Sequence, residues 1–282
     1  MPRHAKRNKH KVALIKPIKL PRRKLLFWGV VACLVYLFVF GKVFLSPRNT
    51  IIWKALFSEY RYPDGFSVRG IDISHHQGTV DWDKLRSALI DGNPIRFVIV
   101  KATQGNAAVD SRFASNFTNA MQYGLVRGAY HYFSPQIDAK SQASHFIANV
   151  NLQTGDLPPI LDFEETGSMT PRQTAQAALS WLETVEKHYG VKPILYTNYK
   201  FKLKYFSGKE FEQYPYWIAH YYVDTLKYQG KWKFWQHTDC GKVSGISTRV
   251  DLNVYNGSMY DLEKFTIPEQ YARKQKTNPG NK

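Results

Sequence analysis

Two carboxylates, Asp162 and Glu164, are spaced in a way that suits acid and base chemistry. Residues i and i+2 of a β-strand share a face, so both carboxylates would point to one side while Phe163 packs on the other. If Asp72 and Asp251 from other strands lie nearby, the crowded carboxylates cannot all ionise easily, and one proton is retained near neutral pH. A protonated carboxylic acid beside ionised partners suits cleavage of a glycosidic bond. The alternative is that the pair is solvated at a strand end, or that one Asp caps a helix.

Several strands are needed to bring these residues together, and the sequence predicts eight. Short β-branched and aromatic runs indicate strands at Val68–Ile73, Phe97–Lys101, Val126–Tyr132, Ile160–Phe163, Pro193–Tyr196, Tyr216–Ala219, Phe234–His237 and Thr248–Leu252. Helix patterns occur at Trp82–Ile90, Arg112–Tyr123, Ala139–Val150, Pro171–Tyr189 and Lys200–Phe206. The Pro171–Tyr189 pattern is the clearest, because Thr170 can cap its start and Gly190 follows its last turn.

Strands that alternate with helices predict an α/β protein with a parallel sheet, and eight strands allow that sheet to close. Helices become rare in the C-terminal half, so the predicted fold is an irregular (β/α) barrel of eight strands with few helices there. An open doubly wound sheet is the alternative, but no glycine-rich phosphate loop follows the first strand. In a barrel of this kind, the site is expected at the carboxyl ends of the strands.

Each predicted strand begins with apolar residues and ends with polar ones. Asp72 ends the first strand, Asp162 the fourth and Asp251 the last. A repeated change of this kind predicts a polar cleft rimmed by aromatic side chains, as in proteins that bind sugars. The candidate substrate-binding residues are Tyr130, His131, Tyr132, Tyr196, His220, Trp235 and Gln236.

Three histidines at strand ends, His131, His220 and His237, could instead hold a metal ion, as in a metal-dependent sugar deacetylase. However, no H-E-x-x-H or comparable pair occurs, and tyrosines and tryptophans interleave with the histidines. We therefore predict neither a metal ion nor another cofactor. Ser74 could belong to a Ser-His-Asp triad, but the sequence has no G-x-S-x-G motif. The two cysteines exclude a disulfide framework and a cysteine-based zinc site.

The net charge of +17 is concentrated at one end of the chain. Residues 1–45 contain eleven of the 39 Lys and Arg residues and none of the 22 Asp and Glu residues. A basic tail could bind nucleic acid, but a tail that precedes an apolar run is explained more simply by membrane insertion. Nucleic acid is therefore not an expected partner.

The run from Leu25 to Gly41 is uncharged and, if Lys42 snorkels, it continues far enough to cross a bilayer core of about 30 Å. The preceding basic residues would keep the N-terminus cytoplasmic and place the remainder outside, in the periplasm or at the cell surface. A cleaved signal peptide is the alternative. The predicted organisation is a basic tail (1–24), a transmembrane signal-anchor (25–45), a spacer (46–66), a catalytic barrel (67–267) and a polar tail (268–282).

Seven motifs in one order resemble glycoside hydrolase family 25, the Chalaropsis-type lysozymes. They extend over about residues 68–257 and comprise Gly70–Gly78 followed by Asp81 and Trp82, Lys101–Gly105, Arg127–Phe133, Leu161–Glu164, Trp217–Tyr221, Phe234–Gln236 and Val250–Asn253. The resemblance implies a β-1,4-N-acetylmuramidase with an irregular eight-stranded barrel. Its partner would be the glycan strands of peptidoglycan, and no obligate protein partner is implied.

Residue roles follow from this resemblance. Glu164 matches the general acid, and Asp162 matches the carboxylate that assists at the anomeric centre. Asp72 and Asp251 match the flanking acidic residues. Gln104 departs from the pattern, because the family often has Glu there, so this position is not counted as catalytic. Whether Asp162 acts as a nucleophile or positions the N-acetyl group of the substrate stays open.

Two other functions fit parts of the sequence. A non-catalytic peptidoglycan-binding module could use the same barrel, although such a module would have no need of the four intact acidic residues. Another glycosidase, such as a chitinase, could also carry Asp162 and Glu164 on a barrel strand. The longer D-x-x-D-x-D-x-E run of chitinases is absent here, since position 160 is Ile.

Overall fold

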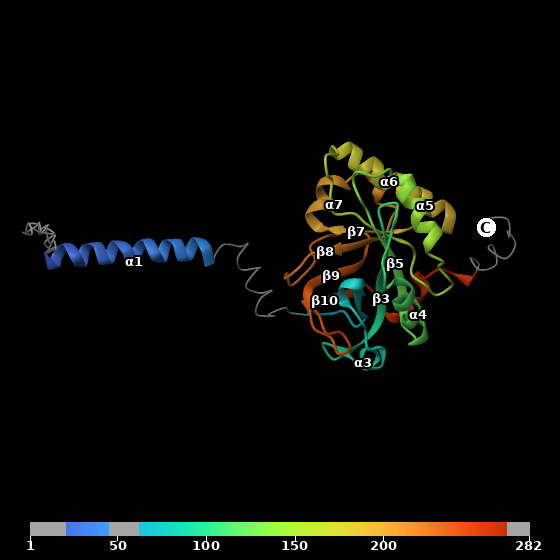
Figure 1. Cartoon of the computed structure of the whole chain (residues 1–282), viewed down its shortest axis with the longest axis horizontal. Coiled ribbons are helices and arrows are strands. Elements are labelled where there is room, and N and C mark those ends of the chain that lie inside the picture. The colour runs from blue at the N-terminus through green and yellow to red at the C-terminus, as the bar shows by residue number, and fades with distance from the viewer. Residues whose placement is uncertain (1–20, 45–61, 270–282) are drawn as a thin grey trace, which may run out of the picture. The chain divides into compact units, whose positions relative to one another are not determined.

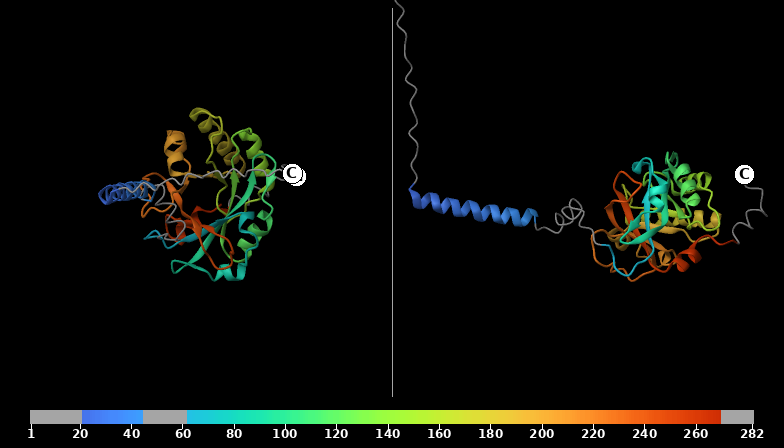
Figure 2. Two further views of the ribbon diagram at one scale, coloured as in Figure 1. Left: turned by 60° about the vertical axis from the view of Figure 1, so that its left-hand side comes forward. Right: turned by 90° about the horizontal axis from the view of Figure 1, so that it is seen from below.

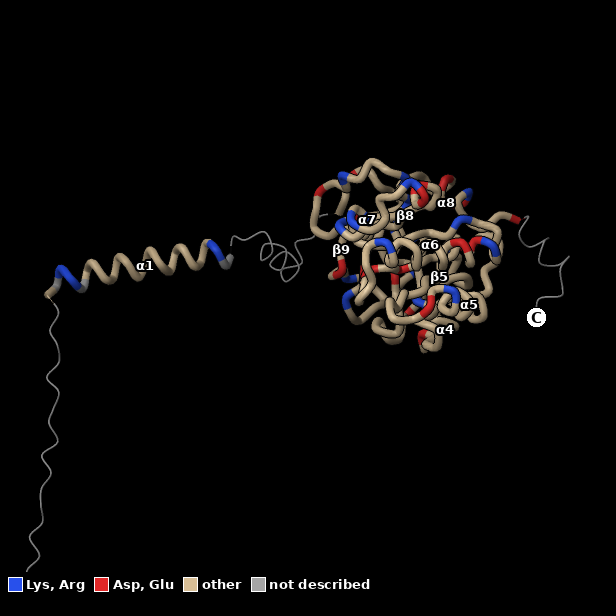
Figure 3. Tube along the Cα trace, turned by 90° about the horizontal axis from the view of Figure 1, so that it is seen from above, with Lys and Arg blue, Asp and Glu red and all other residues tan. Residues whose placement is uncertain are grey.

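The computed structural model describes residues 21–44 and 62–269, and the chain divides into two compact units, Met1–Trp53 and Lys54–Lys282. The first unit contains the 23-residue helix α1 (Arg22–Phe44), which carries Lys and Arg near its two ends and none between (Figure 3). None of the helices in the described ranges combines the length and the apolar character needed to cross a membrane. Most of the predicted basic tail, spacer and polar tail lies outside the described residues.

Eight strands of the second unit form a closed barrel, which confirms the predicted fold class (Figure 1). Around the barrel they follow the order β1, β10, β9, β8, β7, β6, β5 and β3, and β3 then pairs with β1 to close the ring. Their bounds are β1 (Arg69–Ile73), β3 (Asn93–Gln104), β5 (Val126–Tyr132), β6 (Ile160–Asp162), β7 (Ile194–Asn198), β8 (Tyr216–Ala219), β9 (Trp232–Gly241) and β10 (Val250–Tyr255). Two short strands, β2 (Leu89–Ile90) and β4 (Ala108–Val109), pair with β3 from outside the ring.

The sheet is not wholly parallel, which corrects one expectation. Strand β10 runs antiparallel to both of its neighbours, β9 and β1. Only residues 242–249 connect β9 to β10, and a parallel return needs a crossover of about a dozen residues or more. The short connection therefore makes β10 turn back, so its amino end lies at the same edge of the barrel as the carboxyl ends of the parallel strands.

Helices cover the outside of the barrel (Figures 1 and 2). They are α3 (Trp82–Arg86), α4 (Phe113–Gln122), α5 (Ala139–Asn149), α6 (Pro171–Tyr189), α7 (Tyr199–Tyr205) and α8 (Met259–Phe265). Helix α6 begins and ends as its sequence predicts. The Thr170 side chain accepts a hydrogen bond from the backbone N–H of Gln173, and Gly190 adopts a left-handed φ of 68°. Helix α3 is shorter than predicted, since Asp91 and Gly92 have positive φ and turn β2 back onto β3.

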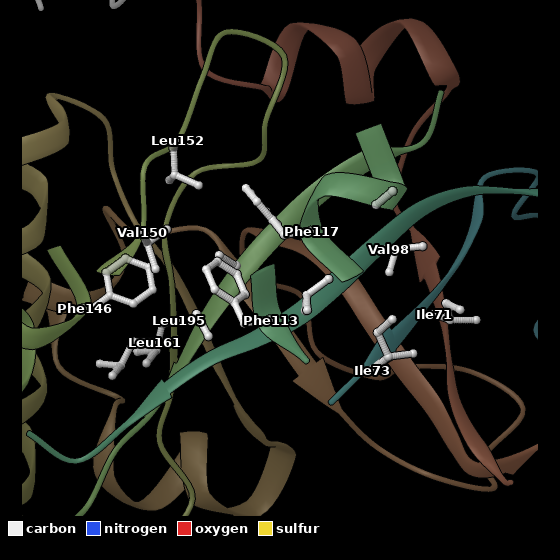
Figure 4. Close-up of a cluster of buried hydrophobic side chains, with 14 of the residues drawn as sticks. Ile71, Ile73, Val98, Phe113, Phe117, Phe146, Val150, Leu152, Leu161 and Leu195 are labelled. Carbon is white, nitrogen blue, oxygen red and sulfur yellow. The ribbon is translucent and has the colours of Figure 1, made fainter. Parts of the chain in front are cut away.

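Strand alternation divides the apolar side chains between two cores. One fills the barrel interior, where Phe97 packs edge-on against Phe234 at 5.1 Å. The other lies between the barrel and its helices, and includes Leu161 and Phe146 (Figure 4). In β6 the alternation places Leu161 in the outer core, so that the next residue, Asp162, points toward the interior.

Candidate active site

The four predicted catalytic carboxylates lie at one end of the barrel. Asp72 on β1 is directly opposite Asp251 on β10 in the strand register. Asp162 is the last residue of β6, and Glu164 follows it by two positions. Electrostatic interactions link Glu164 to Asp72 and Asp251, which shows that carboxylates from three separate strands form one cluster.

Gln236 of β9 connects this cluster to two tyrosines. Its Nε2 donates to Asp72 Oδ2 at 2.8 Å and to Asp251 Oδ2 at 3.2 Å. Its Oε1 accepts hydrogen bonds from the hydroxyl groups of Tyr196 and Tyr221, each at 2.7 Å. All donors and acceptors of the amide are used, and only 2% of the side chain is exposed. Gln236 therefore holds the carboxylates in position and is too enclosed to bind substrate directly.

Asn253 binds Asp72 directly, and Trp217 binds Asn253 in turn. Asn253 Nδ2 donates to Asp72 Oδ2 at 2.6 Å, while its Oδ1 accepts from Trp217 Nε1 at 2.8 Å. The Trp217 ring also contacts the Tyr196 ring, with a centroid separation of 4.3 Å. The sequence-based site did not include Asn253, Trp217 or Tyr221. A buried Asn in an apolar strand was the available signal for Asn253.

Asp72 and Asp251 form a hydrogen-bonded pair of carboxyl groups. Burial, together with the charge of Asp72, raises the pKa of Asp251 to about 9. Burial also raises the pKa of Asp72, but the hydrogen bonds from Asn253 and Gln236 oppose this shift by favouring its ionised form. Near neutral pH, Asp251 consequently favours its protonated form, while the hydrogen bonds to Asp72 favour the carboxylate there.

Asp162 and Glu164 form a second hydrogen-bonded pair. Burial raises the pKa of Glu164 to about 6 and raises that of Asp162 well above its usual value. The hydrogen bond between them raises the pKa of Asp162 and lowers that of Glu164, so the two carboxyl groups titrate as one pair. The Oδ1 atom of Asp162 is buried and has no hydrogen-bond partner within the described chain.

Lys101 supplies a positive charge that acts on Asp162 of this pair. Its Nζ donates to Gln104 Oε1 at 2.8 Å and lies 4.8 Å from the centre of the Tyr132 ring. Because Gln104 is neutral, it leaves the charge of Lys101 to act on Asp162, where it lowers the pKa and favours the carboxylate. Lys101 was not among the predicted site residues.

The predicted substrate-binding tyrosines differ in their accessibility. Tyr130 and Tyr132 are half-buried, and the Tyr132 hydroxyl donates to Glu165 Oε1 at 2.9 Å. Tyr196 is buried with its hydroxyl bound to Gln236, so it reaches the site only through that amide.

The structure corrects the substrate-binding role predicted for two residues, His131 and Trp235. His131 is fully buried, with Nδ1 2.7 Å from Thr103 Oγ1 and Nε2 3.1 Å from Gln142 Oε1. Trp235 is also buried and donates its indole N–H to the backbone oxygen of His220 at 2.8 Å. Both follow an inward-facing residue on their strand and therefore face outward.

The histidines of the alternative metal site lie apart. His131 stacks on Trp181 of α6, and the His220 ring stacks on Tyr199 of α7 at 4.9 Å. His237 packs edge-on against Trp235. Across residues 21–44 and 62–269, no group of three or more His, Cys, Asp or Glu side chains is arranged to hold a metal ion.

A cavity of about 500 Å³ lies away from the carboxylates. It is lined by residues at the amino ends of β8 and β9, including Pro215 and Trp232. Gln236 is four residues farther along β9, which corresponds to about 13 Å of extended strand. The cavity and the carboxylate cluster are therefore separate features.

Comparison with known proteins agrees with this site. Residues 71–246 match the family model "Glycosyl hydrolases family 25". The chain is 40% identical to YegX of Escherichia coli over 73% of its own length and 75% of that protein, and 32% identical to lysozyme M1 of Streptomyces globisporus over 69% and 70%. A family 25 hydrolase structure from Bacillus anthracis superposes with a TM-score of 0.66 at 32% identity, covering 73% of this chain and 96% of that one. The chain therefore belongs to glycosyl hydrolase family 25 and is a glycoside hydrolase.

Proposed function

We propose that this protein is a membrane-anchored muramidase that hydrolyses the β-1,4 bond between N-acetylmuramic acid and N-acetylglucosamine in peptidoglycan. The observation that carries the proposal is the Asp162–Glu164 pair at the carboxyl end of a barrel strand, where burial raises both pKa values and so favours retention of a proton. The relatives support the substrate class, because they include a lysozyme from Streptomyces and an N,O-diacetylmuramidase from Chalaropsis at 30% identity.

Glu164 is the proposed general acid. It is more exposed than Asp162, so it is the carboxyl group of the pair that can contact a leaving-group oxygen. When the proton passes from Glu164 to that oxygen, the pair has lost its proton and Asp162 is free to act as a carboxylate at the anomeric centre. Lys101 supports this step, because its charge favours the ionised form of Asp162.

Asp72 and Asp251 are proposed to stabilise the positive charge that develops on the sugar ring during bond cleavage. Gln236, Tyr196, Tyr221 and Asn253 keep this second pair in place through the hydrogen bonds described above. The proposed substrate contacts come from Tyr130, Tyr132 and His220, which are half-buried at the same end of the barrel.

The membrane anchor is a separate part of the proposal. Its support is the helix α1, whose described side chains from Leu26 to Val39 are almost all exposed although most are large and apolar. The basic residues before the helix predict a cytoplasmic N-terminus and an extracytoplasmic enzyme, in the periplasm or at the cell surface. A reporter enzyme that works only in the cytoplasm, fused after Lys282, should then be inactive. Activity of that fusion, or extraction of the full chain from membranes by alkaline carbonate, would count against the anchor.

Product analysis tests the proposed reaction. Purified peptidoglycan is digested with the full chain in detergent, and the fragments are reduced with borohydride and examined by mass spectrometry. The proposal predicts reduced N-acetylmuramic acid at the new ends. Reduced N-acetylglucosamine would indicate a different glycosidase, and binding without new reducing ends would indicate a non-catalytic module.

A further inference from the structure

An exposed histidine at the catalytic end of the barrel is fixed by a buried carboxylate. His75 follows Asp72 by three residues, and its Nδ1 lies 2.6 Å from Asp110 Oδ2. The same oxygen accepts a hydrogen bond from the His75 backbone N–H at 3.0 Å. The His75 side chain is 45% exposed, whereas the Asp110 side chain is 0% exposed.

The hydrogen bonds of Asp110 determine which imidazole nitrogen carries a proton. Its other oxygen, Oδ1, accepts from the Arg112 backbone N–H at 2.9 Å. An ionised carboxylate can only accept hydrogen bonds, so Nδ1 of His75 must be the donor. In the neutral imidazole, Nε2 is then an acceptor. No described group makes a hydrogen bond to this nitrogen, although the ring is held in one orientation.

The backbone that carries His75 is also held firmly. Residues His75–Gln77 form a short 3-10 helix that begins with a capping box, in which Ser74 and Gln77 satisfy each other's backbone amides. The Gln77 side chain then donates to the backbone oxygen of Arg249, just before β10, at 3.2 Å. The segment is therefore connected to both strands that carry the Asp72–Asp251 pair, to β1 through the chain and to the start of β10 through Gln77.

The His75–Asp110 pair lies close to the carboxylate cluster. Asp110 interacts electrostatically with Lys101 and with Tyr130, and both of these residues also interact with Asp162. The imidazole therefore stands at the end of the barrel where the substrate would lie.

We propose that His75 is a substrate-binding residue, whose Nε2 accepts a hydrogen bond from a sugar hydroxyl or amide N–H of the glycan, and that Asp110 is the positioning residue that fixes its tautomer. This inference rests on the proposed function, because it takes a glycan as the ligand. It adds an imidazole nitrogen to a site otherwise built from acids, tyrosines and Lys101.

Kinetics on peptidoglycan provide the first test, using the full chain. Loss of one neutral hydrogen bond should lower kcat/KM of His75→Ala by about 2- to 13-fold. His75→Gln should recover part of this loss, because an amide oxygen can reach a similar position. His188→Ala on α6 is the control, since His188 is also surface-exposed but has no carboxylate partner among the described residues, whereas the His76 ring packs on that of His75 at 4.0 Å. The kcat/KM of His188→Ala should stay within about twofold of the wild-type value.

Nuclear magnetic resonance provides a second test that does not depend on turnover. Imidazole ¹⁵N signals are recorded in the Glu164→Gln background, with and without a tetrasaccharide of alternating N-acetylglucosamine and N-acetylmuramic acid. His75 should show a protonated Nδ1, and its Nε2 signal should move when the tetrasaccharide binds. Asp110→Asn should disturb this tautomer. If Asp110→Asn fails to fold, the His75 variants alone decide the question.

The outcomes separate this inference from the proposed function. If Glu164→Gln abolishes hydrolysis but His75→Ala has normal kcat/KM and only a lower melting temperature, His75 is structural and the inference is wrong. An unmoved Nε2 signal at saturating tetrasaccharide would also overturn it. If the wild-type chain releases no reducing ends from peptidoglycan, the proposed function itself fails.

Discussion

Asp72 and Asp251 lie directly opposite each other on antiparallel strands, and Gln236 Nε2 donates a hydrogen bond to each of their carboxyl groups. Burial, together with the charge of Asp72, raises the pKa of Asp251 to about 9 and favours its protonated form. Asp251 is therefore uncharged around neutral pH, where the Asp162–Glu164 pair retains its proton. The charges that raise the pKa of Glu164 come from Asp72 and Glu165, and this distinction can be measured.

The substitution Asp251→Asn should leave the basic limb of the pH–rate profile in place. Asn is neutral, as Asp251 is near neutral pH, and the Asn side-chain amide can still donate to Asp72. We expect the basic limb of kcat/KM, which reports loss of the proton that the Asp162–Glu164 pair retains, to shift by less than about 0.5 unit. The measurement is kcat/KM against pH on a soluble glycan fragment. A clear move of the limb to lower pH would mean that Asp251 is ionised and repels Glu164.

The same residue should influence how stability depends on pH. A carboxyl group whose pKa is higher in the folded protein stabilises the fold fully below its unfolded pKa, and this stabilisation is lost as pH rises through the folded value. For Asp251 the window extends from about pH 4 to about pH 9. The melting temperature should therefore fall less between pH 5 and pH 8 in Asp251→Asn than in the wild type, as followed by circular dichroism. An equal or larger fall in the variant would contradict the raised pKa.

Lys101→Met should move the acidic limb of the rate profile. The charge of Lys101 lowers the pKa of Asp162, so its removal should raise that pKa further. Catalysis that needs ionised Asp162 would then begin at higher pH, and the bell-shaped profile would become narrower. Lys140→Met, an exposed change on α5, serves as the control. An acidic limb at the wild-type position in Lys101→Met would show that Lys101 does not act on Asp162.

The separation of Asp162 and Glu164 predicts the stereochemistry of the product. Their carboxyl groups are hydrogen-bonded, which is closer than the roughly 6.5–9.5 Å that an inverting enzyme needs to admit a water molecule. We expect the β-anomer to form first, with retention of configuration. Proton NMR of the anomeric signals during the first minutes of hydrolysis measures this outcome. Initial formation of the α-anomer would require these two carboxyl groups to separate.

The barrel could be predicted from the sequence because its strands are short β-branched and aromatic runs bounded by clear turns. The Val126–Tyr132 and Tyr216–Ala219 strands have the predicted bounds. The direction of β10 was not predicted, because it depends on how the short connection of residues 242–249 folds back. Asp251 was nevertheless assigned to the correct edge, since the start of an antiparallel strand meets the ends of its parallel neighbours.

The faces of the strands were harder to predict than the strands themselves. Tyr130, His131 and Tyr132 are all polar or aromatic, so the sequence does not indicate which of them points inward. Only the packing of His131 against Trp181 and Gln142 reveals that it belongs to the outer core. Gln236 was expected to contact substrate, and its role as a four-way hydrogen-bond link depends on groups from β1, β7 and β10 that no local pattern brings together.

The substitution Glu164→Gln tests most directly whether this carboxyl group is the general acid. Gln keeps the size and the hydrogen-bonding capacity of Glu but cannot donate the proton. We expect kcat/KM on peptidoglycan to fall by about 10²- to 10⁴-fold, while glycan binding and the melting temperature change little. Glu263→Gln, an exposed change on α8, should retain wild-type activity. Activity within tenfold of the wild type in Glu164→Gln, or loss of its folded structure, would contradict the assignment of Glu164 as the acid.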